Sequence, residues 1–252
     1  MIPADLRAAL ELFAGLPRVL VATDYDGVTA PIVSDPAAAH PLPGTVEALV
    51  ALAALPGVTV AVVSGRDRAT LDRLSGVEEP IVTVGSHGAE WAEGFESPLD
   101  AAALARRDAV LAGLEEIAAR HPGAAVERKP LGAALHVRNV ADAADADGAL
   151  EQARRGPASV PGVHATEGKA VLELTVTDAS KGRALTLIRD RVGAQAVLYL
   201  GDDVTDEKAF AVLESAGDVS VKVGDGETAA RFRVRGPEDA RAVFEDLAAL
   251  RA

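Results

Sequence analysis

Short runs of aliphatic residues recur along the chain, and each run ends in polar residues. The three clearest runs cover residues 19–24, 58–64 and 197–202. Continuous β-branched and aliphatic runs of this length are typical of strands buried on both faces of a parallel sheet. Two shorter runs, at 81–84 and 219–223, predict further strands.

Helical patterns stand between or after these strands, at residues 44–54, 68–74, 181–191 and 206–214. Alternation of strands and helices predicts βαβ units, and therefore an α/β fold with a doubly wound, mostly parallel, Rossmann-like sheet. In such sheets ligands bind at the carboxyl ends of the strands, where the polar residues of this chain gather.

The middle of the chain has a different pattern. Its predicted elements are a long amphipathic helix, two strands, a second helix and a hairpin with a glycine turn, at 101–120, 125–129, 133–138, 146–155 and 166–169. We therefore expect a small α/β domain inserted into the sheet domain. The pattern predicts a core of residues 1–98 and 176–252 and an inserted domain of residues 99–175.

The composition restricts the class of protein and its partners. Of the 252 residues, 49% are hydrophobic and 25% are charged, a balance typical of globular proteins. The sequence contains no cysteine, which excludes disulfides, thiolate metal sites and cysteine nucleophiles. The net charge of −13 argues against nucleic acid or an anionic membrane as a partner. An acidic enzyme still binds an anionic small molecule where a metal ion and a few cations reverse the charge locally.

The sequence also bears on location. No apolar run approaches the ~20 residues that cross a bilayer. The first residues lack the basic and apolar stretches of a secretory signal. We therefore expect an unexported, cytoplasmic protein, and we expect it to be a monomer.

Two aspartates, Asp24 and Asp26, close the first predicted strand, and Gly27 allows a tight turn after them. A carboxylate is a competent nucleophile toward phosphorus, and Mg²⁺ prefers carboxylate and phosphate oxygens as ligands. This spacing can place one carboxylate on a metal ion and the other beside it. The alternative is a polar strand end whose aspartates cap the following loop.

A second acidic group, residues 201–207, follows another predicted strand and opens a helix. Thr205 is the candidate N-cap of this helix. Asp206 and Glu207 would then lie in the first turn, where negative charge favours the helix dipole. Helix capping alone is a sufficient account of these two residues.

Capping does not explain Asp202 and Asp203, which place like charge at the end of the strand. Like charges packed together usually require a cation. A Mg²⁺ ion shared by Asp24, Asp26 and Asp202 would supply that charge.

Two further positions are candidates for binding phosphate. Ser64 and Gly65 end the second strand and offer a hydroxyl and a flexible backbone as hydrogen-bond donors, although such residues are also common at strand ends. Lys181 stands at a predicted helix start after Ser180, where a cation opposes the helix dipole. Because local rules tend to fail at functional sites, Lys181 is a candidate phosphate ligand, and an ordinary solvated lysine is the alternative.

Four motifs together resemble those of the haloacid dehalogenase superfamily of phosphotransferases, and they lie at residues 24–27, 64–66, 181–182 and 201–207. More narrowly, the chain resembles trehalose-6-phosphate phosphatases. The stretches that support this are 30–32, 85–90, 127–129, 136–138 and 168–173. The similarity runs from about Arg18 to Leu250, and the inserted domain resembles a C2-type cap.

The resemblance implies roles for the core residues. Asp24 attacks phosphorus, and Asp26 protonates the leaving sugar oxygen and later activates water. Ser64, Gly65 and Lys181 hold the phosphate. The implied Mg²⁺ ligands are Asp24, Asp26 through its backbone carbonyl, and Asp202.

The resemblance also implies sugar contacts. They are His87 in the core and, in the inserted domain, Glu127, Lys129, His136, Arg138 and Glu173. Without the resemblance, the charged residues of the inserted domain also fit a solvated strand face, and His87 also fits a satisfied loop histidine. Val137 stands where the family frequently has tyrosine, which removes an aromatic surface near the implied sugar site.

The resulting hypothesis is a magnesium-dependent phosphoric monoester hydrolase that converts trehalose 6-phosphate to trehalose through an aspartyl-phosphate on Asp24. Two alternatives stay open. The substrate is another sugar phosphate or a pseudo-sugar phosphate, or the chain is a non-catalytic sensor of phosphosugars.

Overall fold

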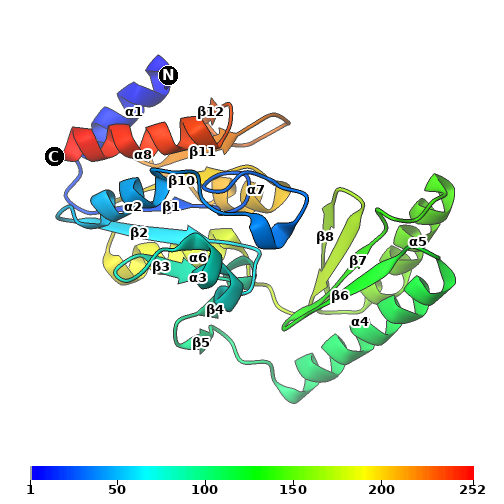
Figure 1. The fold of residues 1–252 in the computed structure, drawn as a ribbon. Helices are drawn as coiled ribbons and strands as arrows, with labels where there is room; N and C mark the ends of the chain where they lie inside the picture. The colour runs from blue at the N-terminus through cyan, green and yellow to red at the C-terminus, as the bar shows by residue number, and fades with distance from the viewer. Residues whose placement is uncertain (1) are drawn as a thin grey trace. The chain divides into compact units, whose positions relative to one another are not determined.

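A computed structural model of the chain describes residues 2–252. These residues form two compact units, each described by itself. The core unit comprises the residues up to Glu96 together with Ala179–Ala252, and the inserted unit comprises Ser97–Asp178. Figure 1 shows the elements of both units.

A parallel sheet of six strands forms the centre of the core unit, in the order β12-β11-β10-β1-β2-β3. The strands are β1 (Val19–Thr23), β2 (Val58–Val63), β3 (Val82–Val84), β10 (Ala196–Gly201), β11 (Val219–Val223) and β12 (Phe232–Val234). The chain reverses its direction of travel across the sheet beside β1. In a doubly wound sheet, this position opens a crevice at the carboxyl ends of the strands.

Helices pack on both faces of this sheet (Figure 1). They are α1 (Ala4–Ala14), α2 (Thr45–Ala53), α3 (Arg68–Ser75), α6 (Lys181–Val192), α7 (Val204–Ala211) and α8 (Pro237–Arg251). The short elements of the unit are η1 (Pro36–Ala38), η2 (Ser86–Gly88), β4 (Glu90–Trp91) and β5 (Gly94–Phe95).

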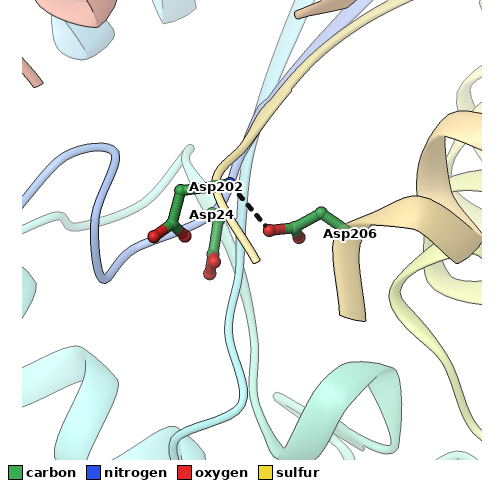
Figure 2. A group of neighbouring side chains, drawn as sticks. All are labelled: Asp24, Asp202 and Asp206. Carbon is green, nitrogen blue, oxygen red and sulfur yellow. Dashed lines mark hydrogen bonds between the residues drawn. The ribbon is translucent and has the colours of Figure 1, made fainter. Parts of the chain in front are cut away.

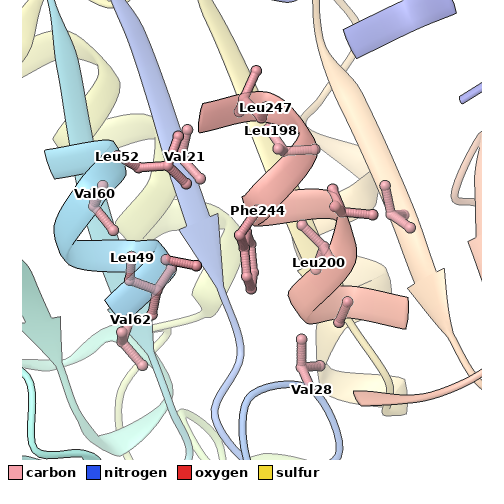
Figure 3. Packing of buried hydrophobic residues seen from close by; sticks show 14 of the residues in the cluster. Val21, Val28, Leu49, Leu52, Val60, Val62, Leu198, Leu200, Phe244 and Leu247 are labelled. Carbon is pink, nitrogen blue, oxygen red and sulfur yellow. The ribbon is translucent and has the colours of Figure 1, made fainter. Parts of the chain in front are cut away.

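Side chains of the central strands alternate between two apolar layers, because successive residues of a strand point to opposite faces. Val21 of β1 and Leu198 of β10 pack against Leu49, Phe244 and neighbouring residues of α2 and α8, as Figure 3 shows. Burial of these apolar side chains on both faces keeps the carboxyl ends of β1, β2 and β10 in fixed register.

The opposite layer contains the alternate residues of the same strands. Leu20 of β1 and Val197 of β10 pack with Leu185 and Ile188 of α6 and with Phe210 of α7. Helices α6 and α7 are therefore held against the sheet face beside the acidic residues that follow β1 and β10.

The inserted unit has an antiparallel four-stranded sheet in the order β6-β7-β9-β8. Its elements are α4 (Ala101–Arg120), β6 (Ala125–Lys129), β7 (Gly132–His136), α5 (Ala143–Arg155), η3 (Pro157–Ser159), β8 (His164–Gly168) and β9 (Val171–Thr175). Leu135, Leu172 and Leu174 line one face and pack with Leu114 of α4 and Leu150 of α5. The other face carries charged and small residues.

The α/β fold with a mostly parallel sheet is confirmed, but details differ from the sequence prediction. Helix α7 spans Val204–Ala211 rather than 206–214, and its N-cap is Asp203, so the prediction of Thr205 was wrong. The Asp203 side chain accepts a hydrogen bond from Val204 N–H, and the Asp206 side chain accepts one from Asp203 N–H. This capping box starts the helix two residues earlier. Among residues 2–252, no helix combines the length and the apolar character needed to cross a membrane.

Candidate active site

Asp24 lies at the carboxyl end of β1, where its main chain continues the parallel ladder. Its N–H donates to the carbonyl oxygen of Leu200 in β10 at 2.9 Å. Its side chain is buried, and Oδ1 accepts a hydrogen bond of 2.6 Å from the N–H of Tyr25. The nucleophile candidate is therefore held by the sheet and by the loop that follows it.

Lys181 is the first residue of α6 and points its ammonium group at Asp24. The Nζ atom lies 2.8 Å from Asp24 Oδ2 and 2.8 Å from Asp206 Oδ1, and Lys181 is only 2% exposed. Ser180 caps the helix by accepting a hydrogen bond from Arg183 N–H. The two carboxylates offset the unfavourable position of a cation at a helix N-terminus.

Asp202 follows β10 and lies against the loop after β1. Gly27 has φ +77°, and a Cβ atom at this position would lie 2.0 Å from Asp202 Oδ2. A larger residue than glycine therefore cannot occupy this position without displacing the Asp202 carboxylate. One oxygen each of Asp24, Asp202 and Asp206 lies within 4.8 Å of the others, so the structure brings these three carboxylates together.

Asp206 is fully buried and has four hydrogen-bond donors around its carboxylate. Lys181 Nζ and Tyr199 Oη donate to Oδ1 at 2.8 and 2.6 Å. The N–H groups of Asp202 and Asp203 donate to Oδ2 at 2.9 and 3.0 Å. Figure 2 shows Asp206 reaching from α7 to the backbone of Asp202. Asp206 therefore orients its neighbours, and its oxygens are already occupied.

Burial and repulsion among these carboxylates shift their acidity. Burial raises the pKa of Asp24 well above its usual value, Lys181 opposes this shift, and the negative charges of Asp206 and Asp202 add to it. Burial and the charge of Asp206 raise the pKa of Asp202 to about 7. Burial also disfavours the charged form of Lys181, but Asp206 and Asp24 outweigh this effect and raise its pKa. The site therefore has more negative charge than one lysine neutralises.

This donor set fits a hard divalent cation such as Mg²⁺. Among the described residues, none donates a hydrogen bond to the Asp202 carboxylate, so its oxygens are available as ligands. Asp24 contributes a second carboxylate within reach of the same ion. Carboxylate oxygens are the ligands that Mg²⁺ prefers, and a cation would offset the repulsion that adds to burial in raising the pKa values of Asp24 and Asp202.

Asp26 does not join this carboxylate group through its side chain. Arg66 donates two hydrogen bonds of 2.7 Å to the two Asp26 oxygens. The guanidinium also lies 5.6 Å from the centre of the Tyr25 ring. The backbone of Asp26 stays beside Asp24, and the Gly27 N–H donates to Ala30 O at 2.7 Å to close the loop.

Ser64 and Gly65 follow β2, the neighbour of β1 in the sheet. The Ser64 side chain is buried, and its Oγ accepts a hydrogen bond of 3.2 Å from Arg66 N–H. His87 belongs to the same loop cluster, because its N–H donates to Ser64 O at 2.9 Å and its ring lies 2.4 Å from where a Gly65 Cβ would stand. Gly65 is therefore required by the approach of His87.

The predicted sugar ligands other than His87 lie in the inserted unit. Glu127 and Lys129 of β6 and Glu173 of β9 point to the sheet face away from the leucine core, as the strand alternation requires. Lys129 Nζ lies 2.5 Å from Glu173 Oε2, and His136 Nε2 lies 2.9 Å from Glu127 Oε2. Arg138 lies after β7 and is exposed.

Three residues of this site were not singled out by the sequence. Tyr199 lies in the apolar strand β10. The only sign in the sequence was its hydroxyl, which needs a polar partner when it is buried. Lys222 interrupts the apolar strand β11, which was a comparable signal, and it donates a hydrogen bond to the carbonyl oxygen of Asp202. The sequence placed Arg66 in a motif but gave no sign of its contact with Asp26, which is 40 residues away.

Comparisons with known proteins identify the family of the chain. The sequence profile of the trehalose-phosphatase family matches residues 22–238. A trehalose-phosphate phosphatase of Mycobacterium marinum is 36% identical over 237 residues, which cover 88% of this chain and 59% of that protein. The chain therefore spans about three fifths of the length of this relative.

Solved structures give the same result. The C-terminal domain of C. albicans trehalose-6-phosphate phosphatase matches with a TM-score of 0.81 at 25% identity, over 99% of each chain. Trehalose-6-phosphate phosphatase of Aspergillus fumigatus matches with a TM-score of 0.72 at 29% identity, over 96% of this chain and 97% of the other. Because the family profile covers most of the sequence and the fold agrees, the resemblance predicted from the motifs is confirmed: the chain belongs to the trehalose-phosphatase family of the haloacid dehalogenase superfamily.

Proposed function

We propose that this chain hydrolyses trehalose 6-phosphate to trehalose and phosphate, with Mg²⁺ as cofactor and Asp24 as nucleophile. The observation that supports this most strongly is the placement of Asp24. It has a buried ammonium group 2.8 Å from one oxygen and lies within 4.8 Å of an oxygen of Asp202. Such a site can hold a phosphate group and a metal ion beside one carboxylate.

In the first step, an Asp24 oxygen forms a bond to phosphorus while the bond from phosphorus to the sugar oxygen breaks. Lys181 holds the phosphate oxygens that gain charge, together with Ser64 and the backbone of Gly65. Asp24 and Asp202 would hold Mg²⁺, with the Asp26 carbonyl as the third protein ligand. When bound, the ion neutralises charge on the phosphate oxygens. In the second step, water attacks the phosphoryl group and releases Asp24.

Asp26 supplies the proton for the leaving sugar oxygen and then removes a proton from the attacking water. Its side chain must leave Arg66 for this role, because both of its oxygens are occupied by the guanidinium in the present structure. Arrival of a phosphate offers Arg66 another anion and thereby gives Asp26 a route to the leaving group.

The polar face of the inserted unit supplies the sugar contacts in this proposal. Glu127, Lys129, His136 and Glu173 offer both charges and several donors to the hydroxyls of a disaccharide, and small residues between them leave space. We propose that this unit is a cap, and that its face meets the phosphate site when substrate binds. Exclusion of water by such closure is common in enzymes.

The substrate assignment rests on the family and on the names of the relatives, which are trehalose-phosphate phosphatases. A phosphate-release assay tests it with trehalose 6-phosphate beside sucrose 6-phosphate, glucose 6-phosphate and a pseudo-disaccharide phosphate. We expect kcat/KM to be at least about tenfold higher for trehalose 6-phosphate, which corresponds to about 1.4 kcal/mol of transition-state binding. Chelation by EDTA should stop the reaction, and added Mg²⁺ should restore it.

Equal kcat/KM values across these compounds would remove the trehalose assignment and favour a broader sugar phosphatase. Tight binding of trehalose 6-phosphate without any phosphate release would instead favour a sensor. The Asp26 carboxylate speaks against a sensor, because binding of phosphate needs no additional negative group beside it.

A further inference from the structure

We propose that Lys222 is a positioning residue that holds the main chain of Asp202, so that the Asp202 carboxylate faces the divalent cation. This inference rests on the proposed function, because it concerns the cation site of that reaction. Lys222 itself contacts neither Asp24 nor the proposed phosphate ligands.

The contact between Lys222 and Asp202 is buried and direct. Lys222 lies on β11, where it pairs in register with Gly201, the residue before Asp202. It is 4% exposed, and its Nζ atom donates a hydrogen bond of 2.5 Å to the Asp202 carbonyl oxygen. The ammonium group thus reaches the end of the neighbouring strand at the point where the chain turns into α7.

Asp202 is held at both of its backbone polar groups. Its N–H donates to Asp206 Oδ2 at 2.9 Å, and its carbonyl oxygen accepts from Lys222. Its carboxylate lies where a side chain on Gly27 would otherwise stand. These contacts come from α7, β11 and the loop after β1, and one oxygen of the carboxylate that they frame lies within 4.8 Å of an oxygen of Asp24. No described residue donates a hydrogen bond to that carboxylate, so its direction depends on the backbone.

A role in an ordinary ion pair does not account for Lys222. The carboxylate of Glu207 lies 4.0 Å away, and its Oε2 accepts a hydrogen bond of 2.7 Å from Ala229 N–H. Taking a charged group out of water is costly, and attraction across 4.0 Å without a hydrogen bond offsets only part of that cost. A neutral apolar residue would fill the same space in β11 without the cost. The charge is therefore accounted for by the contact with the Asp202 carbonyl.

The proposal makes a prediction of definite sign. At a pH well above the Asp202 pKa of about 7, where that carboxylate is ionised, loss of the Lys222 charge alone would strengthen cation binding, because like charges repel. If Lys222 positions Asp202, its removal weakens cation binding. Residues that orient metal ligands typically change metal affinity by about 10–100-fold when they are replaced.

The experiment measures Mn²⁺ binding by electron paramagnetic resonance in the full chain without substrate. For Lys222→Met, which keeps the length of the side chain but removes the donor and the charge, we expect the Kd for Mn²⁺ to rise at least about tenfold. Lys222→Arg keeps a charged donor, and we expect its Kd to stay within about threefold of the unmodified chain. Lys208→Met is the control, because Lys208 is an exposed lysine of α7, and its Kd should not change.

A Kd for Lys222→Met that is equal to or lower than that of the unmodified chain overturns the proposal. A Kd for Lys222→Arg that rises about tenfold, as much as that of Lys222→Met, also overturns the proposal. Should Lys222→Met not fold, Lys222→Gln has the same expected weakening and the same contrary outcome. The unmodified chain separates the proposed function from the role of Lys222. Failure of the unmodified chain to bind Mn²⁺ contradicts the metal-dependent function. Equal Mn²⁺ binding by the unmodified chain and by Lys222→Met contradicts only the role of Lys222.

Discussion

Arg66 holds the carboxylate of Asp26 through two hydrogen bonds of 2.7 Å each. Asp26, the proposed acid and base, is thus paired with a guanidinium and does not point at the cluster of Asp24, Asp202 and Asp206. A bidentate pair of this geometry is among the stronger polar contacts in proteins. The position of Asp26 before substrate arrives is therefore defined by Arg66.

Replacement of Asp26 tests its role as acid and base. For Asp26→Asn we expect kcat to fall by about 10²–10⁴, because the side chain no longer transfers protons, while KM changes little. Steady-state kinetics with trehalose 6-phosphate measure both. Circular dichroism checks that the fold is kept despite the loss of the charged pair with Arg66. A kcat within tenfold of the unmodified chain would assign proton transfer to another group.

The hydroxyl of Tyr199 is expected to stabilise the buried charge of Asp206. Tyr199→Phe removes a 2.6 Å hydrogen bond to a buried carboxylate, and we expect the free energy of unfolding to fall by about 2 kcal/mol. Urea denaturation measures this quantity. Tyr25→Phe is a matched control, because that hydroxyl is also buried but donates to the neutral carbonyl of Ala39. Its expected cost is about 1 kcal/mol. Equal costs would contradict the special role of Asp206.

The raised pKa of Asp202 predicts how the metal-free protein responds to pH. The pKa of Asp202 is about 7 in the fold against an ordinary value of 3.8, so the folded chain binds this proton more tightly than the unfolded chain. The contribution of Asp202 to stability is complete below pH 3.8 and is lost as the pH rises through about 7. In EDTA, we expect the melting temperature to fall over this range.

Two comparisons isolate this contribution of Asp202. In Asp202→Asn, the part of the pH dependence due to this group should disappear, so its melting temperature should fall less between pH 4 and 7. Added Mg²⁺ should stabilise the unmodified chain most at the higher pH, because the ion binds the charged carboxylate. An identical pH profile in the variant would contradict the raised pKa.

The charged face of the inserted unit predicts an effect on substrate size. Glu173→Gln removes the charge that faces Lys129 at 2.5 Å. We expect kcat/KM for trehalose 6-phosphate to fall by about tenfold or more, while p-nitrophenyl phosphate, which has no sugar, is hydrolysed at an unchanged rate. Arg128→Ala is the control, because Arg128 pairs with Glu115 of α4, away from this face. Equal losses for both substrates would show that Glu173 acts on the chemical step instead.

The main strands could be predicted because their sequences are continuous aliphatic runs that end in polar residues. The terminal helices α1 and α8 were not predicted, although Leu6, Leu10 and Phe13 repeat at helical spacing and are buried together in the structure. In an alanine-rich chain, this pattern is weaker than that of the strands. The start of α7 was misplaced because Asp203 and Asp206 cap it jointly, and Thr205 offered a simpler cap.

The site was partly accessible from sequence for a different reason. Asp24 and Asp202 both follow parallel strands, so the fold alone requires their carboxylates to approach one another. The role of Asp206 was not accessible, because its partner Lys181 is 25 residues away and Tyr199 lies within an apolar strand. Local sequence rules describe capping well, but they do not identify which distant group a buried carboxylate contacts.

The central claim is that Asp24 receives the phosphoryl group. Asp26→Asn should slow release of this group, because water is no longer activated. With p-nitrophenyl phosphate, whose leaving group needs no proton, the group should still form, so the phosphorylated form should accumulate. After rapid acid quenching of this variant with Mg²⁺ and p-nitrophenyl phosphate, mass spectrometry of its peptides should find one added phosphoryl group on Asp24. Turnover of substrate by the unmodified chain, with no phosphoryl group on Asp24 at any quench time in either protein, would contradict the account.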